Sequence, residues 1–595
     1  MDKMNRKCAL AVASALAGAM ASAELPPLPK PWMPDPKTLP QNAGRTLTFD
    51  HPLPRQWLIG AGEKAGPGEK NRHIGTYNNG ELAYPGLLST AGSAFGEMMA
   101  QLRQVVWADR RLVFIDGRVL MCQLNWIRDH VHQSKAFCHW EHDLTSFLDF
   151  ILDTQRADGQ FFELIKQWTD YHWTKVNPDC VRLYPDDAQT LVRLELEADV
   201  EYLVVEGCLQ AWRTTGDDAW LKRALPRLEK GIDYQTSDPK RWDAARGLCK
   251  RPYTIDTWDF LALAGGGDRR IDLDGPMAVM HGDNTGVYQA MRQLAFVNRR
   301  FGDVAKAQAW EARAATLKAN VMRHLYNGRF FVHQLPLNGP PVDGHEAERL
   351  TLSDAYALNR GIWSPEENRR CIEEYRRRRE TGKTFAEWYT IDPPIANACH
   401  KPGEYVNGAI SPFTAGELAK GAFENGYEAY GYDILMRVAA LVKRDGGKLY
   451  FLYHPQTQEP QGRGPSAWGA AAILSAIDQG LAGIQDTDKL YRTMRFAPRW
   501  AVTEHTEGRY LTGYEVSKKK VDVRWIFKEN GFRYRLECPS ETVDAHLFVP
   551  AGRTPQTLRV NGRATAFALS DVFGSRYVDV TVTPERGVAD FEVLY

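Results

Sequence analysis

The sequence has no net charge, no clustered cysteines and, after its first 23 residues, no long apolar run. Lysine plus arginine and aspartate plus glutamate number 74 each, so charge gives no reason to expect nucleic acid or an anionic membrane as a partner. No stretch approaches the about 20 apolar residues of a membrane-spanning helix, so we expect no anchor of that kind. The sequence contains no Cys-x-x-Cys, no His-Glu-x-x-His and no nucleotide-binding loop. We therefore expect neither a metal nor an organic cofactor.

The N-terminus, by contrast, has the pattern of a secretory signal. Three basic residues lie within residues 3–7, residues 9–21 are apolar, and residues 21–23 read Ala-Ser-Ala, a small-residue cleavage site. We expect residues 1–23 to be removed and the mature protein to be periplasmic or extracellular. Eight scattered cysteines follow, and a chain of this length buries a large core without disulfides, so disulfides are permitted but not required.

The rest of the chain divides into three regions by composition and periodicity. Residues 24–82 begin rich in proline and lack periodicity, which predicts an extended arm with short strands. Residues 83–495 show paired amphipathic helices, one of them over residues 138–154, with hairpins that begin near residues 137, 197, 283, 353, 411 and 466. Residues 496–595 alternate between apolar and polar positions with turn signals between, which predicts a small antiparallel β-sandwich.

The spacing of the helical hairpins indicates how they assemble. Long, irregular, aromatic-rich inserts precede several of them, which an open solenoid of constant period would not carry. A closed ring with loops gathered over one mouth fits better. We therefore predict a mainly α protein, an (α/α)6 toroid or six-hairpin barrel, with a short N-terminal extended or β lead-in and the C-terminal sandwich.

The segment 253–260, Tyr-Thr-Ile-Asp-Thr-Trp-Asp-Phe, points to carbohydrate chemistry. It sets Asp256 and Asp259 among aromatic residues, and aromatic faces bind sugar rings while a carboxyl group beside tryptophan is a candidate proton donor. The alternative is a helix N-cap and a surface carboxylate. The 17 tryptophans of the chain agree with a sugar-binding cleft.

Four short motifs resemble segments of known glycosidases. Residues 126–129, Trp-Ile-Arg-Asp, resemble the Trp-x-Arg-Asp of glucoamylase-like enzymes, and residues 255–260 resemble the Gly-Trp-Asp-Phe of trehalases and glycoside hydrolase family 63. Residues 405–408, Tyr-Val-Asn-Gly, resemble the Tyr-Pro-Asn-Gly of trehalases, and residues 464–469 occupy the place of their glycine-rich, tryptophan-containing segment. Over roughly residues 90–490 the chain thus resembles the six-hairpin glycosidases, with trehalases and family 63 as the loosely similar members.

This resemblance implies roles for individual residues. Asp259 takes the role of the general acid. The catalytic glutamate of those relatives has no counterpart in residues 451–454, Phe-Leu-Tyr-His, so the base is expected at Glu404 or Glu459. The expected substrate-binding residues are Trp126, Arg128, Asp129, His130, Asp256, Trp258, Asp283, Asn284, Tyr405, Asn407 and Trp468.

Several of these residues have competing interpretations. Asp283 or Asn284 begins a predicted helix and is either its N-cap or a sugar ligand. His130 and His132 have the spacing of a metal pair on a strand, but hydrogen bonds to sugar hydroxyls are favoured. The acidic run of residues 193–201 is explained first as charge that complements a helix start, and second as Glu197 or Asp199 pointing into the ring.

The expected function follows from two carboxyl groups, one protonated and one ionised, about 6.5 to 9.5 Å apart in an inverting enzyme. We predict a secreted glycoside hydrolase, inverting and exo-acting, that removes terminal sugars from an oligosaccharide or polysaccharide. A polysaccharide lyase is the alternative, with a base among His130, Tyr253, Tyr453 and His454. A non-catalytic glycan-binding protein is the third possibility.

Overall fold

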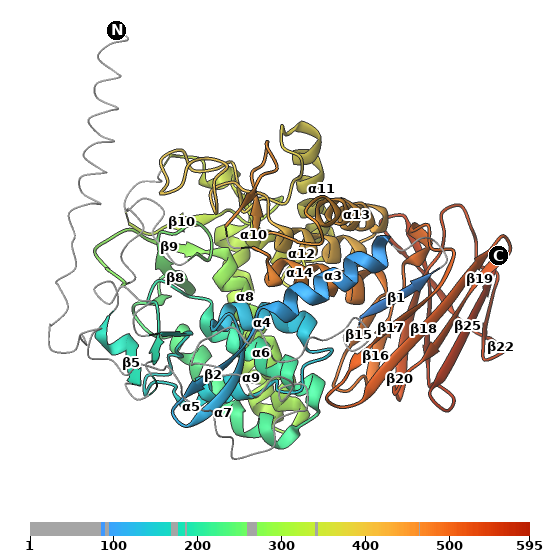
Figure 1. Cartoon of the computed structure of the whole chain (residues 1–595), viewed down its shortest axis with the longest axis horizontal. Coiled ribbons are helices and arrows are strands. Elements are labelled where there is room, and N and C mark those ends of the chain that lie inside the picture. The colour runs from blue at the N-terminus through green and yellow to red at the C-terminus, as the bar shows by residue number, and fades with distance from the viewer. Residues whose placement is uncertain are drawn as a thin grey trace, which may run out of the picture.

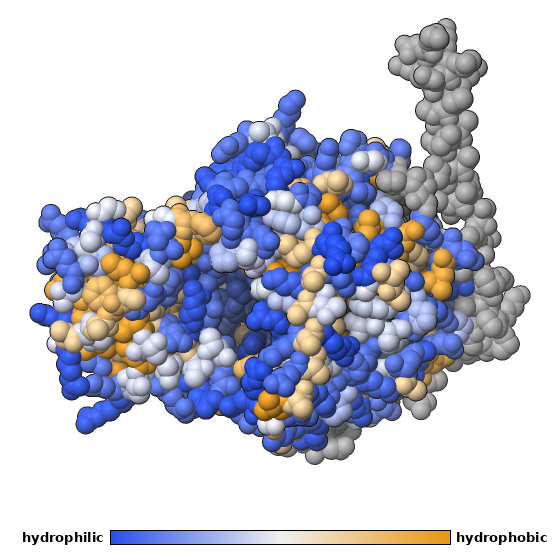
Figure 2. Space-filling view, turned by 180° about the vertical axis from the view of Figure 1, so that it is seen from behind, coloured by the Kyte–Doolittle hydropathy of each residue, from blue (hydrophilic) through white to orange (hydrophobic). Residues whose placement is uncertain are grey.

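The computed structural model describes residues 85–89, 94–167, 177–184, 187, 189–258, 270–338, 343–462 and 464–595. The predicted signal of residues 1–23 and arm of residues 24–82 lie outside this part. A mostly helical body is joined to a sheet-rich C-terminal region, which lies at the right in Figure 1. Seen from behind, a hydrophilic hollow separates the two (Figure 2). No helix in the described ranges is long and apolar enough to span a bilayer.

The helices of the body alternate between an inner and an outer set. Each inner helix contacts the next, and the last contacts the first, so the contacts close a cycle. The inner set is α4 (Ile127–Phe137), α6 (Val200–Thr215), α8 (His281–Arg300), α10 (Leu352–Ala357), α12 (Pro412–Glu424) and α14 (Ala467–Ser475). The outer set is α3 (Ala94–Ala108), α5 (Ser146–Asp153), α7 (Asp218–Gln235), α9 (Val304–Leu325), α11 (Pro365–Thr381) and α13 (Glu428–Arg444).

Small side chains allow the inner helices to approach closely. Every residue of α14 is buried, and its sequence is AWGAAAILS. On α12, a Cβ added at Gly416 would lie only 2.5 Å from the carbonyl carbon of Ala472. Glycine is therefore required at this crossing of α12 and α14, since backbone atoms cannot move aside as a flexible side chain would.

The first helical pair differs from its prediction. The helix expected over residues 138–154 covers only α5, Ser146–Asp153. Asp143 accepts hydrogen bonds from the backbone N–H groups of Thr145 (3.2 Å) and Ser146 (2.9 Å). This side-chain capping competes with helix formation before residue 146 and starts the helix later than the apolar pattern suggests.

Short sheets precede the inner helices where irregular inserts were expected. β3 leads into α4, β9 ends directly before α8, and β11 ends directly before α10. The small sheets are therefore gathered at the N-terminal ends of the inner helices. They comprise β2 (Arg110–Ile115) with β3 (Arg118–Gln123); β4 (Leu164–Gln167), β6 (Gln189–Val192) and β5 (Val181–Tyr184); β10 (Gln334–Pro336), β9 (Met277–Met280), β8 (Leu248–Pro252) and β7 (Trp242–Asp243); β11 (Leu350–Thr351) with β12 (Ile391–Asp392); and β13 (Leu452–Tyr453) with β14 (Pro460–Gln461).

Two larger sheets form the C-terminal region. The first has the order β1 (Gly86–Ser89), β17 (Glu507–Tyr514), β18 (Lys519–Lys528), β19 (Gly531–Glu537), β25 (Val588–Leu594), β21 (Thr557–Val560) and β22 (Arg563–Thr565). The second has the order β15 (Ile484–Asp486), β16 (Thr493–Phe496), β20 (Thr542–Phe548), β24 (Ser575–Val582) and β23 (Ala568–Val572). Phe496 of the second sheet packs on Tyr534 and Phe591 of the first, with ring centroids 5.8 and 6.1 Å apart.

The sheets depart from the predicted sandwich in two ways. They include β15 and β16, which begin before residue 496, and β1 from the start of the described chain, which pairs with β17. The pairing of β16 with β20 is parallel, whereas the other ladders of these sheets are antiparallel. A parallel ladder needs a long crossover, and here residues 497–541, which carry three strands of the first sheet, supply it.

Polar contacts fasten these sheets to the helical body. The buried carboxylate of Asp478 accepts a hydrogen bond from Tyr510 at 3.0 Å, and Arg499 lies 3.1 Å from Glu424 at the end of α12. Removal of residues 496–595 would strip Asp478 and Glu424 of these partners and uncover the aromatic packing. We therefore expect the truncated chain to be insoluble, measured as soluble yield after expression, whereas Tyr510→Phe stays soluble. A soluble, fully active truncation would show that the sheets are dispensable.

Candidate active site

A cavity of about 300 Å³ opens at the N-terminal ends of the inner helices. Its lining comes from segments far apart in the sequence: the start of α4, the end of α3, β4, the loop before α12 and the start of α14. The lining residues are Asp109, Leu124, Trp126, Arg128, Asp129, Gln133, Lys166, Trp258, Tyr405, Phe451, Pro465, Ser466, Ala467 and Trp468. We call this cavity the cleft.

Aromatic rings form the wall and floor of the cleft. Trp468 stacks on His132 with centroids 4.5 Å apart, and its Nε1 donates a hydrogen bond to the Tyr356 hydroxyl at 2.8 Å. Trp258 packs against Tyr405 and Phe451 at 5.9 and 5.8 Å. The Nε1 atom of Trp258 has no hydrogen-bond partner within the described residues. Phe413 also stacks on Trp468 at 4.5 Å, and Trp258 and Trp468 are only 6 % and 5 % exposed, so the wall of the cleft is a packed aromatic cluster that presents ring edges.

Arg128 is held rigidly at the base of the cleft. Its Nε and Nη2 atoms donate to the two carboxylate oxygens of Asp199 at 2.6 and 2.8 Å, and Nη2 also donates to Glu197. Burial opposes the charge of Arg128, but Asp199 and Glu197 outweigh it and hold the pKa of the guanidinium above its usual range. Burial likewise acts to raise the pKa of Asp199, and Arg128 reverses this to a lower pKa. Arg128 is therefore a fixed cation.

These contacts settle the role of the acidic run before α6. Glu197 and Asp199 are 0 % and 2 % exposed. They do not form a solvated helix start, as the first interpretation had it, but point inward and bind Arg128. The pairing of residues about 70 positions apart was not visible in the sequence.

Asp129 stands in the first turn of α4, partly exposed, and lines the cleft. The chain reaches this position through Leu124 and Asn125, both with positive φ, and an extended Trp126. These conformations turn the strand β3 into α4 and bring Trp126 and Asp129 to the same cavity. A negative charge in the first turn of a helix is favoured by the helix dipole, so an ionised Asp129 suits this place.

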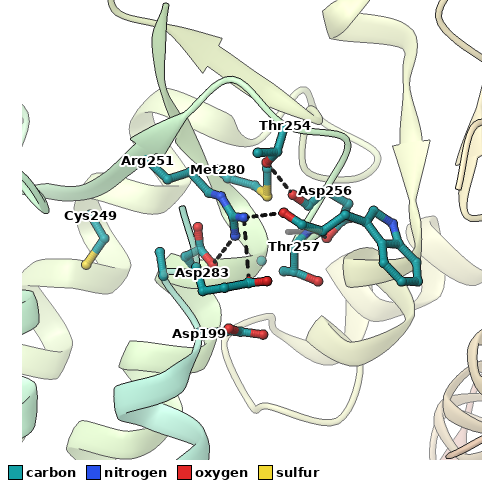
Figure 3. A network of polar contacts seen from close by, with 12 residues as sticks. Asp199, Cys249, Arg251, Thr254, Asp256, Thr257, Met280 and Asp283 are labelled. Carbon is teal, nitrogen blue, oxygen red and sulfur yellow. Dashed lines mark hydrogen bonds and ion pairs between the residues drawn. The ribbon is translucent and has the colours of Figure 1, made fainter. Parts of the chain in front are cut away.

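Arg251 anchors the segment of residues 253–258 through a hydrogen bond to its last residue. This buried guanidinium donates to the carbonyl oxygen of Trp258 at 2.6 Å and to Asp283 at 3.4 Å, and lies 3.8 Å from Glu197. Figure 3 shows Arg251 and Asp283 pointing toward one another. Burial raises the pKa of Asp283 to about 6 against the opposing effect of Arg251. Asp259 itself lies outside the described residues, and Arg251 fixes the peptide group that precedes it.

Asp256 has a scaffold role in the structure. It is fully buried with φ of 47°, and its carboxylate accepts hydrogen bonds from Ser353 Oγ at 2.6 Å and the Thr257 N–H at 2.7 Å. These bonds tie the segment to the first turn of α10. The structure does not bring Asp256 to the cleft wall.

Other predicted ligands are likewise buried and bonded to the chain. Asn284 binds the N–H and C=O groups of Cys249 at 2.8 and 3.0 Å, and Asn407 binds those of Ile395, both at 2.8 Å. His130 packs between two phenylalanines, and burial lowers its pKa to about 3. None of these three lines the cleft, and neither does Asp283. The N-cap interpretation of residues 283 and 284 does not hold either, since α8 begins at His281.

Neither candidate base enters the cleft lining. Glu404 is exposed and accepts the Lys401 N–H at 3.3 Å, and Glu459 is exposed and accepts the Thr457 hydroxyl at 3.2 Å. The lyase candidates are also elsewhere: Tyr253 binds Glu346, and the Tyr453 hydroxyl donates to Asp445 at 2.9 Å. His454 does not line the cavity. The carboxyl groups that do line it, among the described residues, belong to Asp109 and Asp129.

Four further cleft residues were harder to anticipate. Gln133 lies one helical turn after Asp129, so helical spacing could have placed it on the same face. Lys166 lies with its Nζ 6.0 Å from the Trp126 ring. No local pattern in the sequence places Asp109 or Phe451 near the cleft, and only the folding of the chain brings them there. No group of three or more His, Cys, Asp or Glu residues in the described part of the chain is arranged to hold a metal ion.

Comparison with known proteins adds fold similarity. No protein-family model and no curated protein matches the chain. Among solved structures, the GH78 rhamnosidase of Bacillus sp. GL1 has 13 % identity and a TM-score of 0.54, covering 78 % of this chain and 42 % of its own. The α-L-rhamnosidase of Dictyoglumus thermophilum has 10 % identity and a TM-score of 0.56, covering 86 % and 50 %. The GH63 mannosylglycerate hydrolase of Thermus thermophilus has 14 % identity and a TM-score of 0.47, covering 64 % and 99 %.

The two rhamnosidases carry the conclusion about the fold. This chain spans half or less of their length, and identity is low throughout. The predicted resemblance to six-hairpin glycosidases is thereby confirmed as a resemblance of fold. The sequence motifs had suggested trehalases and family 63, and the rhamnosidases were not anticipated.

Proposed function

We propose that this protein is a glycoside hydrolase that binds its sugar in the cleft. The observation that carries the proposal is convergence: six residues expected to contact sugar, from four distant segments, line one cavity. They are Trp126, Arg128, Asp129, Trp258, Tyr405 and Trp468. The similarity of fold to two rhamnosidases supports the same class of reaction. We further infer that the closed cycle of inner helices is an (α/α)6 toroid.

The proposed mechanism divides the chemistry between two carboxyl groups. Asp259, which follows the anchored Trp258 peptide, donates a proton to the departing glycosidic oxygen. Asp129, placed in the cleft where negative charge is favoured, takes a proton from the attacking water. Two hydrogen bonds to Asp199 fix the orientation of the Arg128 guanidinium, so it binds sugar hydroxyls without reorganising.

The shape of the cleft supports exo action. Its volume of about 300 Å³ lies at the small end for ligand pockets, and Trp468, fixed by Tyr356 below it, closes the floor. A terminal sugar fits such a site better than the middle of a polymer chain. We also propose that the reaction inverts the anomeric carbon, that the protein is exported, and that its partner is a carbohydrate.

The charges in the cleft lining balance, with Arg128 and Lys166 against Asp109 and Asp129. This balance favours an uncharged sugar.

The experiment is a panel of glycosides and oligosaccharides with neutral terminal sugars, rhamnosides included, followed by proton NMR of the first product formed. We expect release of one terminal sugar with inverted anomeric configuration. Unsaturated products from uronate-containing glycans would instead identify a lyase. Tight glycan binding without turnover would identify a binding protein.

A further inference from the structure

A second cavity, of about 120 Å³, lies inside the ring of inner helices and shares no lining residue with the cleft. We call it the axial cavity. All six inner helices contribute to it, the last through residues 475 and 479 at the end of α14 and in its π-helical continuation. Its lining residues are Lys135, Glu206, Gln210, Arg213, Gln289, Gln293, Tyr356, Asn359, Arg360, Glu417, Lys420, Ser475 and Gln479.

The charged groups of this lining do not balance. Four are cationic and two are carboxylates, so the formal charge is four minus two, or a surplus of two positive charges. Both carboxylates are directed at the same lysine. The Nζ atom of Lys135 lies 2.5 Å from Glu417 and 3.9 Å from Glu206, and Glu417 also accepts Asn359 Nδ2 at 2.9 Å.

In the described part of the chain, the other three cations make no ion pair with a carboxylate, although Glu417 and Glu206 attract Arg360 and Lys420 at longer range. Lys420 donates to the side-chain oxygen of Gln479, and Arg360 donates to the Gly282 carbonyl at 2.8 Å and to Thr285 Oγ1 at 2.7 Å. The buried Nε of Arg213 has no hydrogen-bond partner within the described residues. Across those residues, none of the three forms an ion pair with a carboxylate.

Two carboxylates behind the lining do not remove the surplus. Glu424 is engaged by Arg495 and lies 3.1 Å from Arg499. Asp486, near Arg213, accepts the N–H groups of Tyr491 and Asp488 at 2.9 and 3.1 Å, so both of its carboxylate oxygens are already engaged. Buried charge is unfavourable unless it is paired, so a bound anion would stabilise the two positive charges that the lining has in excess.

We propose that the axial cavity binds a small tetrahedral oxyanion, of which inorganic phosphate and sulfate are examples. A cavity of about 120 Å³ has room for one such ion and is well below the about 300 to 1,000 Å³ of pockets that hold larger ligands. The cations supply charge-assisted hydrogen bonds, and the glutamine amides around them supply further donors. The proposal does not depend on the glycosidase assignment.

The axial cavity is coupled to the cleft through one side chain. Tyr356 lines the axial cavity, Arg360 lies 5.5 Å from its ring centroid, and its hydroxyl accepts the hydrogen bond from Trp468, which lines the cleft. An oxyanion that orders Arg360 therefore also orders the floor of the sugar site.

The test uses the full mature chain, dialysed free of phosphate and sulfate, and titrates inorganic phosphate at constant ionic strength. Calorimetry and thermal unfolding should both show saturable binding. Lys420→Met removes one cation whose hydrogen bond goes to a neutral amide, and it should weaken phosphate affinity by at least about tenfold, as expected for one charge-assisted hydrogen bond. Lys443→Met, at an exposed position on α13, is the matched control and should bind as the wild type does.

A second variant keeps the test decisive if Lys420→Met does not fold. Arg213→Gln should lower phosphate affinity in the same direction. The absence of any saturable response to phosphate and sulfate in the wild type would overturn the proposal, as would equal affinities in wild type, Lys420→Met and Arg213→Gln. A response to chloride alone would overturn the oxyanion assignment.

Discussion

Asp259→Asn is expected to lower kcat on the natural glycan by about 10² to 10⁴-fold, the usual contribution of a general acid. Substrate binding should survive, because asparagine keeps the size and polarity of the side chain while it loses the transferable proton. The measurement is kcat and KM on the substrate that the glycoside panel identifies.

The control for Asp259 is a substrate with an activated leaving group. Such a leaving group departs with little protonation, so Asp259→Asn should lose much less activity on it. The matched variant is Asp256→Asn, three residues earlier. Because the buried Asp256 carboxylate holds Ser353 and the Thr257 N–H, this change should lower thermal stability rather than act on the protonation step. Normal hydrolysis of the natural glycan by Asp259→Asn would remove Asp259 from the mechanism.

Asp129→Asn should cost kcat about 10² to 10⁴-fold on all substrates, activated ones included, because activation of the leaving group does not replace the base that deprotonates water. The two carboxyl groups are thus separable: the leaving group rescues one variant and not the other. A pre-steady-state comparison on both substrate types measures this directly.

Glu404→Gln and Glu459→Gln are the matched controls for Asp129. Both side chains are exposed and neither lines the cleft, so each variant should stay within a few fold of wild-type activity. An inactive Glu404→Gln beside an active Asp129→Asn would return the role of the base to Glu404, one of the two positions expected from the sequence.

The helical part of the fold was largely accessible from the sequence because amphipathic periodicity is a local signal. The predicted hairpin starts near 197, 283, 353, 411 and 466 lie within three residues of the inner helices that begin at 200, 281, 352, 412 and 467. Pairings at long range were not accessible. β1 has four residues and no distinctive pattern, and only its pairing with β17 makes it a strand of the C-terminal sheet.

The candidate site divides in the same way. The motifs around Trp126 and Trp468 were recognisable, and both residues reach the cleft. The sequence could not distinguish Asp129, which faces the cleft, from Asp256. The Asp256 carboxylate is hydrogen-bonded to Ser353, about a hundred residues away in the chain. Nor could it show that Glu197 and Asp199 form ion pairs with Arg128, since a buried ion pair depends on packing and not on local spacing.

The most direct test of the central claim is to run the reaction in heavy-oxygen water and to measure whether oxygen from the water enters the product. A glycoside hydrolase adds water across the bond it breaks, so mass spectrometry of the released sugar should show one labelled oxygen at the anomeric carbon. The Asp129→Asn, Asp259→Asn double variant should release no labelled sugar, because it should not turn over. An unlabelled product with a new carbon–carbon double bond, formed by the wild type, would contradict hydrolysis and establish elimination instead.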